Sequence, residues 1–360
     1  MRSFLIKRWE SIVTTEDPTD LEILARFFLG LASRAYGLAM RVRDWGYKEN
    51  ISHVRRIPVP AISIGNISLG GTGKTQVVIW CAKKLREEGK KVVVLSRGYG
   101  RVGKEETRIV SDESRILASA DEAGDEPVLI ARSIQGLPVV VGADRAQSAR
   151  VALERFSPDV FLLDDAFQHR KFHRDLDVVC VDEHMLEAPR LFPAGYLREG
   201  AGSLSRAQFL LYKTDQEDQF RAQFKKTFSF FPVQPSAVFT YEPQGLKEHA
   251  TGNLHPLDTI KRRPVLAFSG IANPRTFERL LKSCGADLIA FKVFPDHHHF
   301  TDPELEILIR EAREKNSFLV TTEKDRVRLP AQVPAWSLQV EIKWLKGESE
   351  FLQTVLRTVG

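Results

Sequence analysis

Cysteine is scarce in this chain of 360 residues. The three cysteines, Cys81, Cys180 and Cys284, lie far apart and form no CxxC pair. This argues against a disulfide scaffold or a cysteine-based zinc site and favours a reducing compartment. We also expect no secretory signal at the N-terminus, and no uncharged apolar run approaches the roughly 18 residues that a membrane-spanning helix needs.

The excess of one sign of charge over the other is also small. The 52 basic and 47 acidic side chains leave a net charge of +5, which is too small to identify an anionic partner, and we expect no nucleic acid among the partners. Hydrophobic residues make up 43% and charged residues 28%, as in globular chains that form a core. The length predicts two domains.

The segment Leu21–Trp45 is rich in apolar residues but interrupted by charges. On a helical wheel its polar residues fall within an arc of roughly 120°. They are Glu22, Arg26, Ser33, Arg34, Arg41 and Asp44. The opposite face holds Leu24, Phe28, Leu31, Ala32, Leu38, Ala39 and Val42. Such an amphipathic helix fits the surface of an anionic bilayer, and it also fits a helix packed on its own domain; both interpretations stay open.

A glycine-rich turn follows the short strand expected over Pro58–Ile64, and a helical pattern follows the turn. This order predicts a phosphate-binding P-loop, because glycines let backbone N–H groups surround phosphate oxygens at the positive end of a helix. Ser68 stands where the strict pattern has glycine. The candidate nucleotide-binding residues are Asn66, Gly70, Gly71, Thr72, Gly73, Lys74 and Thr75. Lys74 is expected to reach the β- and γ-phosphates, and the Thr75 hydroxyl to bind Mg²⁺.

Two acids, Asp164 and Asp165, follow an apolar strand expected over residues 159–163. This is the pattern of a Walker B strand, whose carboxylate holds the metal of a P-loop enzyme. A third strand, at residues 91–95, is followed by Arg97, and open α/β sheets bind ligands at the carboxyl ends of their strands. Strands alternating with helical segments predict an α/β fold of the P-loop NTPase type, a mostly parallel sheet flanked by helices.

The character of the chain changes near Ser229–Pro232, where prolines interrupt regular structure. Residues 238–241 and the segment after Gly252 are expected to pair as a hairpin. We expect three parts: an N-terminal extension with the amphipathic helix (1–50), a P-loop catalytic domain (51–235), and a linker hairpin with a smaller C-terminal α/β domain (236–360).

Two further motifs carry titratable side chains. Asp125 and Glu126 precede Pro127, which by itself indicates the acidic first turn of a helix. The consecutive histidines His297 to His299 cannot all bind one metal ion from an extended segment, because their side chains alternate in direction. A histidine that shares a proton with a carboxylate base is the favoured interpretation.

Taken in order, these motifs resemble the tetraacyldisaccharide 4′-kinase family, the lipid A 4′-kinases of Gram-negative bacteria. The similar segments are PVPAISIGNISLGGTGKT, LSRGYGR, GDEPVLIA, PVVVGADR, FLLDDAFQH, FPAGYLRE, FSGIANPRTFERL, FPDHHHFT and TTEKDRVRL. With the amphipathic helix they extend from about Leu21 to Leu329. The family's own loop reads GGTGKT, which accounts for Ser68. Ala166 departs from the glycine that the family usually has after the paired acids, and we expect it to leave those acids in place.

The resemblance implies transfer of the γ-phosphoryl group of ATP, with Mg²⁺, to the 4′-hydroxyl of a tetraacylated glucosamine disaccharide 1-phosphate, a lipid A precursor. It implies a peripheral (monotopic) enzyme on the cytoplasmic face of the bacterial inner membrane, attached through the N-terminal helix, with no obligate protein partner.

The same resemblance assigns residue roles. The implied catalytic residues are Asp125 as the base, His297 as its partner, and Lys74. The implied metal ligands are Thr75, Asp164, Asp165 and Glu199. Weaker candidates for substrate or phosphate contacts are Arg97, Glu126 and Arg198. Because Asp125 and His297 are far apart in the sequence, we expect them in different domains and a site that assembles by domain closure.

Two other functions stay open on the residues alone. A P-loop GTPase or ATPase that acts on a protein client at the membrane is one, since Lys213-Thr214-Asp215 faintly resembles a guanine-reading NKxD pattern, although Tyr212 replaces its asparagine. A nucleotide-gated membrane-binding module without acceptor chemistry is the other. GTP outcompeting ATP would favour the first, and turnover that ignores a lipid acceptor would favour the second.

Overall fold

The computed structural model describes residues 2–103, 105–228 and 235–360. They form two compact units, each assembled from separate stretches of chain. Unit 1 contains Met1–Val92, Ala152–Thr240 and Trp344–Gly360, and unit 2 contains Val93–Val151 and Tyr241–Lys343. The change of character expected at Ser229–Pro232 lies outside the described residues.

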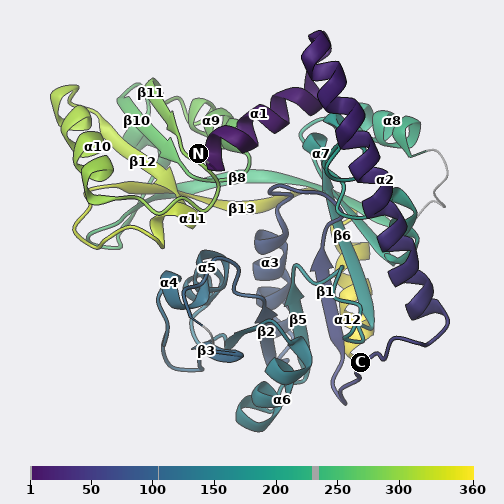
Figure 1. Cartoon of the computed structure of the whole chain (residues 1–360). Helices are drawn as coiled ribbons and strands as arrows, with labels where there is room; N and C mark the ends of the chain where they lie inside the picture. Colours follow the sequence, from purple (N-terminus) through teal and green to yellow (C-terminus); the bar gives the residue numbers. More distant parts are fainter. Residues whose placement is uncertain (1, 104, 229–234) are drawn as a thin grey trace. The chain divides into compact units, whose positions relative to one another are not determined.

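Unit 1 is built on a parallel sheet whose strands lie in the order β8, β7, β6, β1 and β5 (Figure 1). Their bounds are β1 Ala61–Gly65, β5 Val160–Asp164, β6 Leu176–Asp182, β7 Phe209–Lys213 and β8 Ser236–Glu248, of which β8 continues from Tyr241 onward as part of unit 2. Every residue of β1, β5 and β6 is buried, which explains why these strands are mostly apolar and do not alternate between apolar and polar residues. The strands predicted before the P-loop and before the paired acids are confirmed.

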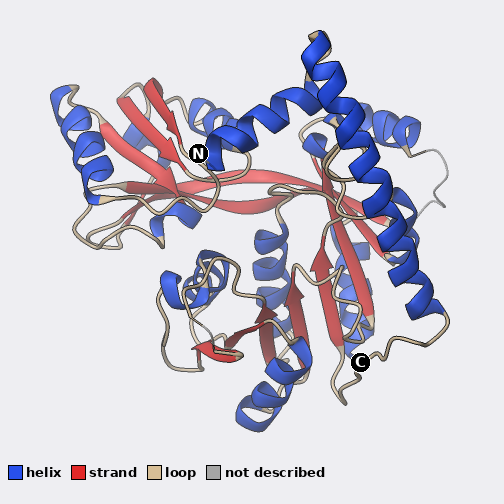
Figure 2. Cartoon of the chain, viewed as in Figure 1, coloured by secondary structure: helices blue, strands red, loops and turns tan. Residues whose placement is uncertain are grey.

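Helices flank the strands of unit 1, as Figure 2 shows in blue beside red. They are α1 Arg2–Thr14, α2 Asp20–Lys48, α3 Lys74–Glu87, α7 Glu183–Glu187, the 3₁₀ helix η1 Ala201–Arg206, α8 Glu217–Thr227 and α12 Glu348–Val359. A further helix, α6 (Arg145–Phe156), starts in unit 2 and ends in unit 1. The mostly parallel, helix-flanked sheet predicted from the sequence is therefore confirmed.

Helix α2 spans the predicted amphipathic segment. It begins at a capping box, in which the Thr19 hydroxyl accepts from the backbone N–H of Glu22 and the Glu22 carboxylate accepts from the Thr19 N–H at 3.0 Å. The polar residues Glu22 and Ser33 are buried, whereas Phe27 and Phe28 are each 60% exposed. The helix thus packs on the rest of unit 1 by part of its polar face, while Arg34 and Arg41 of that face are exposed. By length and composition alone, α2 would also suffice to cross a membrane.

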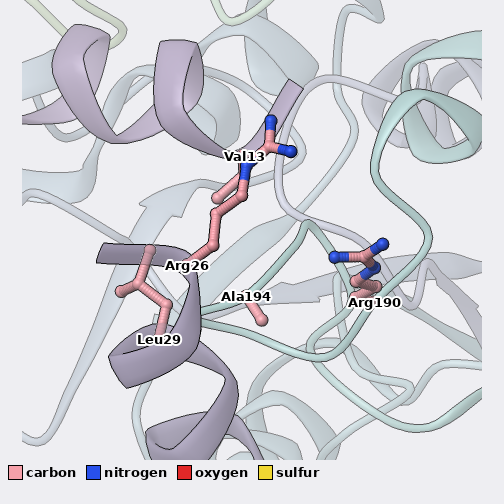
Figure 3. Close-up of a pocket in the computed structure, with 5 residues that line it drawn as sticks. All are labelled: Val13, Arg26, Leu29, Arg190 and Ala194. Atoms are coloured by element: carbon pink, nitrogen blue, oxygen red, sulfur yellow. The ribbon is translucent and has the colours of Figure 1, made fainter. Parts of the chain in front are cut away.

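A small pocket lies between α1, α2 and the loop after α7 (Figure 3). It is lined by Val13, Arg26, Leu29, Arg190 and Ala194. Arg26 extends from α2 toward α1, where its Nε donates to the carbonyl of Ile12 at 2.6 Å. The pocket holds about 10 Å³, roughly the space of one water molecule, so it is a packing seam and not a site for a sugar or nucleotide.

Unit 2 contains two groups of strands. In the first, β2 (Val92–Ser96) runs parallel to β4 (Val139–Gly142), and β3 (Thr107–Ser111) is antiparallel to β4. In the second, parallel strands follow the order β11, β10, β12 and β13. Their bounds are β10 Pro264–Ser269, β11 Asp287–Val293, β12 Phe318–Thr322 and β13 Trp336–Lys346.

The helices of unit 2 are α4 Ala120–Ala123, α5 Asp125–Ser133, η2 Leu257–Ile260, α9 Pro274–Ser283, α10 Asp302–Glu314 and α11 Glu323–Arg326. The predicted hairpin is present, but its register was wrong. Leu246 and Lys247 of β8 pair with β9 (Leu254–His255), while residues 238–239 pair with β7. The strand β8 is longer than the sequence suggested, so its far end makes the hairpin.

Candidate active site

The P-loop connects β1 to α3 within unit 1. Gly73 caps the N-terminus of α3 with a φ of 90°, a left-handed conformation that glycine adopts without strain. Ser68 instead forms an extended bridge with Leu197, so this position needs no glycine. Lys74 opens the helix and is 9% exposed, with its Nζ 3.5 Å from Asp165 Oδ1.

Several polar side chains of this loop are buried without a hydrogen-bond partner among the described residues. They are the amide of Asn66 and the hydroxyls of Ser68 and Thr72. A buried polar group without a partner costs roughly 1–3 kcal/mol. A loop that carries several of them, at the N-terminus of a helix, is suited to receive the polar atoms of a phosphate-bearing ligand.

Strand β5 brings the paired acids beside the P-loop. Ile64 and Asp164 are paired in the parallel register, and the Asp165 N–H donates to the Ile64 carbonyl at 2.9 Å. Asp165 adopts a φ of 50°, which an aspartate tolerates better than most residues. Ala166 is buried and has no positive φ, so the glycine of the family pattern is not required at this position.

The carboxyl of Asp165 is ionised in this arrangement. Burial raises its pKa, but Lys74 and Arg198 outweigh burial and hold the pKa at about 2. Arg198 Nη1 lies 2.9 Å from Asp165 Oδ2. The structure thus brings three of the predicted residues together as one charged cluster at the P-loop.

The residues beside the P-loop are suited to Mg²⁺ and not to a metal ion whose ligands all come from the protein. The described part of the chain has no group of three or more His, Cys, Asp or Glu side chains that would hold an ion. Thr75, Asp164 and Asp165 offer one hydroxyl and two carboxylates, and Mg²⁺ binds through one or two carboxylates and completes its shell with water and phosphate oxygens.

Glu199, the fourth implied metal ligand, is engaged elsewhere. It is 1% exposed, and its two carboxylate oxygens accept from Arg43 and from Arg206, each at 2.5 Å. A metal role for Glu199 requires at least one arginine to release it, so this role stays a prediction.

In unit 2, the glycine before α5 positions the candidate base. Gly124 has a φ of 93°, and a Cβ there would lie 2.8 Å from the Tyr99 carbonyl oxygen, so a larger residue does not fit. This close approach places the turn after β2 against the start of α5, where Asp125 is 5% exposed. Arg97, in the same turn, is exposed, and its substrate role stays a prediction.

Asp125 and His297 are in direct contact within unit 2. His297 Nδ1 lies 2.9 and 3.0 Å from the two carboxylate oxygens of Asp125. We expected the two residues in different domains, and this was wrong, because residues 93–151 and 241–343 fold into the same unit. No closure is needed to form the pair.

The three consecutive histidines diverge, as the extended geometry predicts. His298 Nε2 lies 3.0 Å from Glu304 Oε2, and His299 Nδ1 lies 3.6 Å from Asp121 Oδ1. Only His297 turns toward Asp125, and it does so with a φ of 59°. Of the three consecutive histidines, His297 is therefore the one that pairs with the carboxylate of Asp125.

Lys324 was given no role of its own from the sequence, although it lies within the quoted segment TTEKDRVRL. Its Nζ lies 3.1 Å from Glu126 Oε1, 3.3 Å from Asp296 Oδ1 and 3.4 Å from His297 Nε2. His297 Nε2 also lies 3.6 Å from Asp296 Oδ2. The ring of His297 is therefore held between the Asp125 carboxylate at Nδ1 and the Lys324 and Asp296 side chains at Nε2.

The cations around Asp125 keep it charged. Burial raises the pKa of its carboxyl, but the hydrogen bond from His297 and the charges of Lys324 and Arg328 hold the pKa at about 2. Arg328 Nε lies 3.7 Å and Lys324 Nζ 3.9 Å from Asp125 Oδ2. Asp125 is therefore an ionised, buried acceptor at neutral pH.

Comparison with known proteins gives a consistent result. Residues 25–359 match the family model described as tetraacyldisaccharide-1-P 4′-kinase. A tetraacyldisaccharide 4′-kinase of Geobacter sulfurreducens is 37% identical over 340 residues, which cover 93% of this chain and 94% of that protein. One of Syntrophus aciditrophicus is 35% identical over 363 residues, covering 97% of this chain and 96% of that protein.

A solved structure is similar over the same length. The crystal structure of an "apo" form of LpxK from Aquifex aeolicus in complex with ATP matches with a TM-score of 0.77 and 35% sequence identity, covering 93% of this chain and 100% of that chain. With its phosphate loop, paired acids and carboxylate–histidine pair in place, this chain belongs to the tetraacyldisaccharide-1-P 4′-kinase family.

Proposed function

We propose that the protein transfers the γ-phosphoryl group of ATP to the 4′-hydroxyl of a tetraacylated glucosamine disaccharide 1-phosphate. The observation that carries this proposal is the buried, ionised Asp125 paired with His297, in a chain that also has a P-loop. A buried carboxylate oriented by a histidine is suited to accept the proton of an attacking hydroxyl group.

The P-loop residues would hold the nucleotide. Lys74 would leave Asp165 for the β- and γ-phosphates, and the buried Asn66 and Thr72 side chains would gain partners. Thr75, Asp164 and Asp165 would hold Mg²⁺, which neutralises charge on the phosphoryl oxygens when bound. Arg198, already beside Asp165, adds a positive charge near the same place.

Asp125 would accept the proton of the acceptor hydroxyl. The hydroxyl oxygen bonds to the γ-phosphorus as the bond from that phosphorus to the bridging oxygen breaks, and ADP leaves with the electron pair. A carboxylate with a pKa of about 2 is a weak base, so the proton moves late, after the forming bond has made the hydroxyl acidic. His297 holds the carboxylate in orientation, and Lys324 holds His297.

Helix α2 would attach the enzyme to the membrane surface, on the cytoplasmic face of the inner membrane where its lipid acceptor is held. Its exposed apolar residues are Leu21, Ile23, Leu24, Phe27, Phe28, Leu31, Leu38, Val42 and Trp45. On the other face, Arg26, Ser33 and Tyr36 hydrogen-bond to unit 1. A helix bonded to its own unit along its length lies on a bilayer and does not cross it.

The proposal is tested by ADP release with and without the lipid disaccharide. We expect turnover that depends on the acceptor, and no acceptor-dependent turnover under several detergent conditions would contradict the proposal. Competition between GTP and ATP for binding distinguishes the proposed kinase from the GTPase alternative. ATP is expected to bind more tightly, because the carboxylate of Asp215, which would have to recognise guanine, accepts a hydrogen bond from the hydroxyl of Thr240.

The membrane contact has its own test. Substituting both exposed phenylalanines, Phe27→Ser with Phe28→Ser, is expected to weaken binding to anionic vesicles by roughly tenfold to a hundredfold, since each side chain loses part of its apolar burial in lipid. ATP binding should be unchanged. Equal vesicle binding by the variant would show that this face does not contact lipid.

A further inference from the structure

Helix α2 makes one contact that an anchor does not need. Arg43, near its C-terminal end, donates from Nη2 to Glu199 Oε1 at 2.5 Å. Glu199 is almost fully buried, and Arg206 takes its other oxygen. Burial lowers the pKa of the Arg43 guanidinium, but the bond to Glu199 outweighs it and raises the pKa overall, as expected for a tight ion pair.

The same helix is bonded to the segment that leads to Glu199. The Ser33 hydroxyl donates to the Leu191 carbonyl at 2.9 Å, and the Tyr36 hydroxyl donates to the Arg198 carbonyl at 2.6 Å. From α1, Trp9 Nε1 donates to the Pro193 carbonyl at 2.7 Å. We call residues 190–199 the bridging loop. Both N-terminal helices hold this loop through its backbone.

The bridging loop is in turn bonded to the phosphate loop. The Leu69 N–H donates to the Tyr196 carbonyl, and the Arg198 N–H donates to the Ile67 carbonyl, each at 2.7 Å. Arg198 also pairs with Asp165, whose other oxygen lies 3.5 Å from Lys74 Nζ. A continuous series of hydrogen bonds and ion pairs therefore connects helix α2 to the P-loop lysine, Lys74.

We propose that α2 is a positioning element of the phosphate site, and that Arg43 is the positioning residue through which it acts. Arg43 fixes Glu199, and Glu199 fixes the end of the bridging loop that presents Arg198 to the phosphates. This inference rests on the proposed function and adds to it. A lipid surface that holds α2 in place also holds the phosphate-binding residues in place.

The matched pair Arg43→Met and Arg41→Met tests the proposal. Each variant removes one cation from α2, but Arg41 is exposed and makes no hydrogen bond or ion pair with the described residues. Arg41→Met is expected to bind anionic vesicles about fivefold more weakly, the effect of one charge near the surface, whereas Arg43 is paired with buried Glu199 and its loss should weaken vesicle binding less. In detergent micelles with saturating acceptor, only Arg43→Met is expected to lower kcat, by roughly tenfold, and to raise the KM for ATP.

Two milder variants keep the test decisive if Arg43→Met folds poorly. Arg43→Lys retains one donor to Glu199 and should recover part of kcat. Tyr36→Phe removes only the bond to the Arg198 carbonyl and should lower kcat less than Arg43→Met. Equal kcat values for Arg43→Met and Arg41→Met would show that α2 serves only to attach the protein to the membrane. If Arg43→Met folds poorly, wild-type kcat values for both Arg43→Lys and Tyr36→Phe would show the same. Failure of the proposed function would be distinct, since the unmodified protein would then show no acceptor-dependent turnover.

Discussion

The two functional regions of this protein differ in whether the side chains that define each site have partners. In unit 1, the P-loop buries the side chains of Asn66, Ser68 and Thr72 without partners among the described residues. In unit 2, Asp125 is surrounded by His297, Lys324 and Arg328. The comparison teaches that the phosphate site is left incomplete for its ligand, whereas the base is set before any substrate arrives.

The largest effect is expected from Asp125→Asn. The amide keeps the shape but cannot accept a proton, so turnover should fall by about 100- to 10,000-fold. ATP affinity, measured by calorimetry, should be unchanged because the P-loop is intact. Near-normal turnover would show that Asp125 is not the base.

Lys74→Met should affect both binding and chemistry. The P-loop lysine loses its contact with the phosphates, so we expect turnover to fall by about 100- to 1,000-fold and ATP to bind more weakly. The measurement is the pair of kcat and ATP dissociation constant. If ATP affinity is retained while turnover is lost, Lys74 acts only in the chemical step, as Asp125 does, and does not contribute to nucleotide binding.

A smaller effect is expected from Lys324→Met, and it should depend on pH. Removing the ammonium favours the protonated form of Asp125, so the pKa of that carboxyl rises above about 2 and the acidic limb of kcat/KM moves to higher pH. At neutral pH, turnover should fall by roughly tenfold, the scale of one lost charge-assisted hydrogen bond.

The control for this variant is Lys315→Met, which removes an exposed lysine of unit 2 that pairs with Glu311. It should leave the pH profile in place. An unshifted acidic limb in Lys324→Met would mean that this lysine does not influence the base.

The smallest effect is expected from Thr72→Val. This hydroxyl is buried without a partner among the described residues, so removing it should leave the free energy of unfolding equal or higher. ATP should bind several-fold more weakly, because the Thr72 hydroxyl is expected to form a hydrogen bond with the bound nucleotide. Thr321→Val is the matched control: its hydroxyl is similarly buried in unit 2, and its loss should not change ATP affinity. Equal ATP affinities in the two variants would remove Thr72 from the nucleotide site.

Local patterns made the phosphate region predictable from the sequence. A strand, a glycine-rich turn and Gly-Lys-Thr specify the P-loop within one short segment, and an apolar run followed by Asp164 and Asp165 specifies the strand beside it. The parallel pairing of Ile64 with Asp164 then brings these segments together.

Contacts between distant segments were not predictable from local patterns. The bond from Arg43 to Glu199 spans 156 positions, and that from Lys324 to Glu126 spans 198. Arg43 lies in no distinctive local pattern, and the motifs that contain Glu199, Glu126 and Lys324 do not indicate which side chains they meet. The pairing of Asp125 with His297 was expected only from the resemblance to a family. The wheel of α2 likewise showed two faces but could not tell which one packs on the protein, since a buried polar face needs partners that only the fold reveals.

The position of the transferred phosphoryl group on the product distinguishes a 4′-kinase from the alternatives. The protein is incubated with γ-labelled ATP and either the tetraacylated disaccharide 1-phosphate or its 4′-deoxy analogue, and the label is located by mass spectrometry. We expect label on the 4′ oxygen of the first acceptor and none on the analogue. Label at another position, or release of labelled phosphate at the same rate with both acceptors, would contradict this expectation.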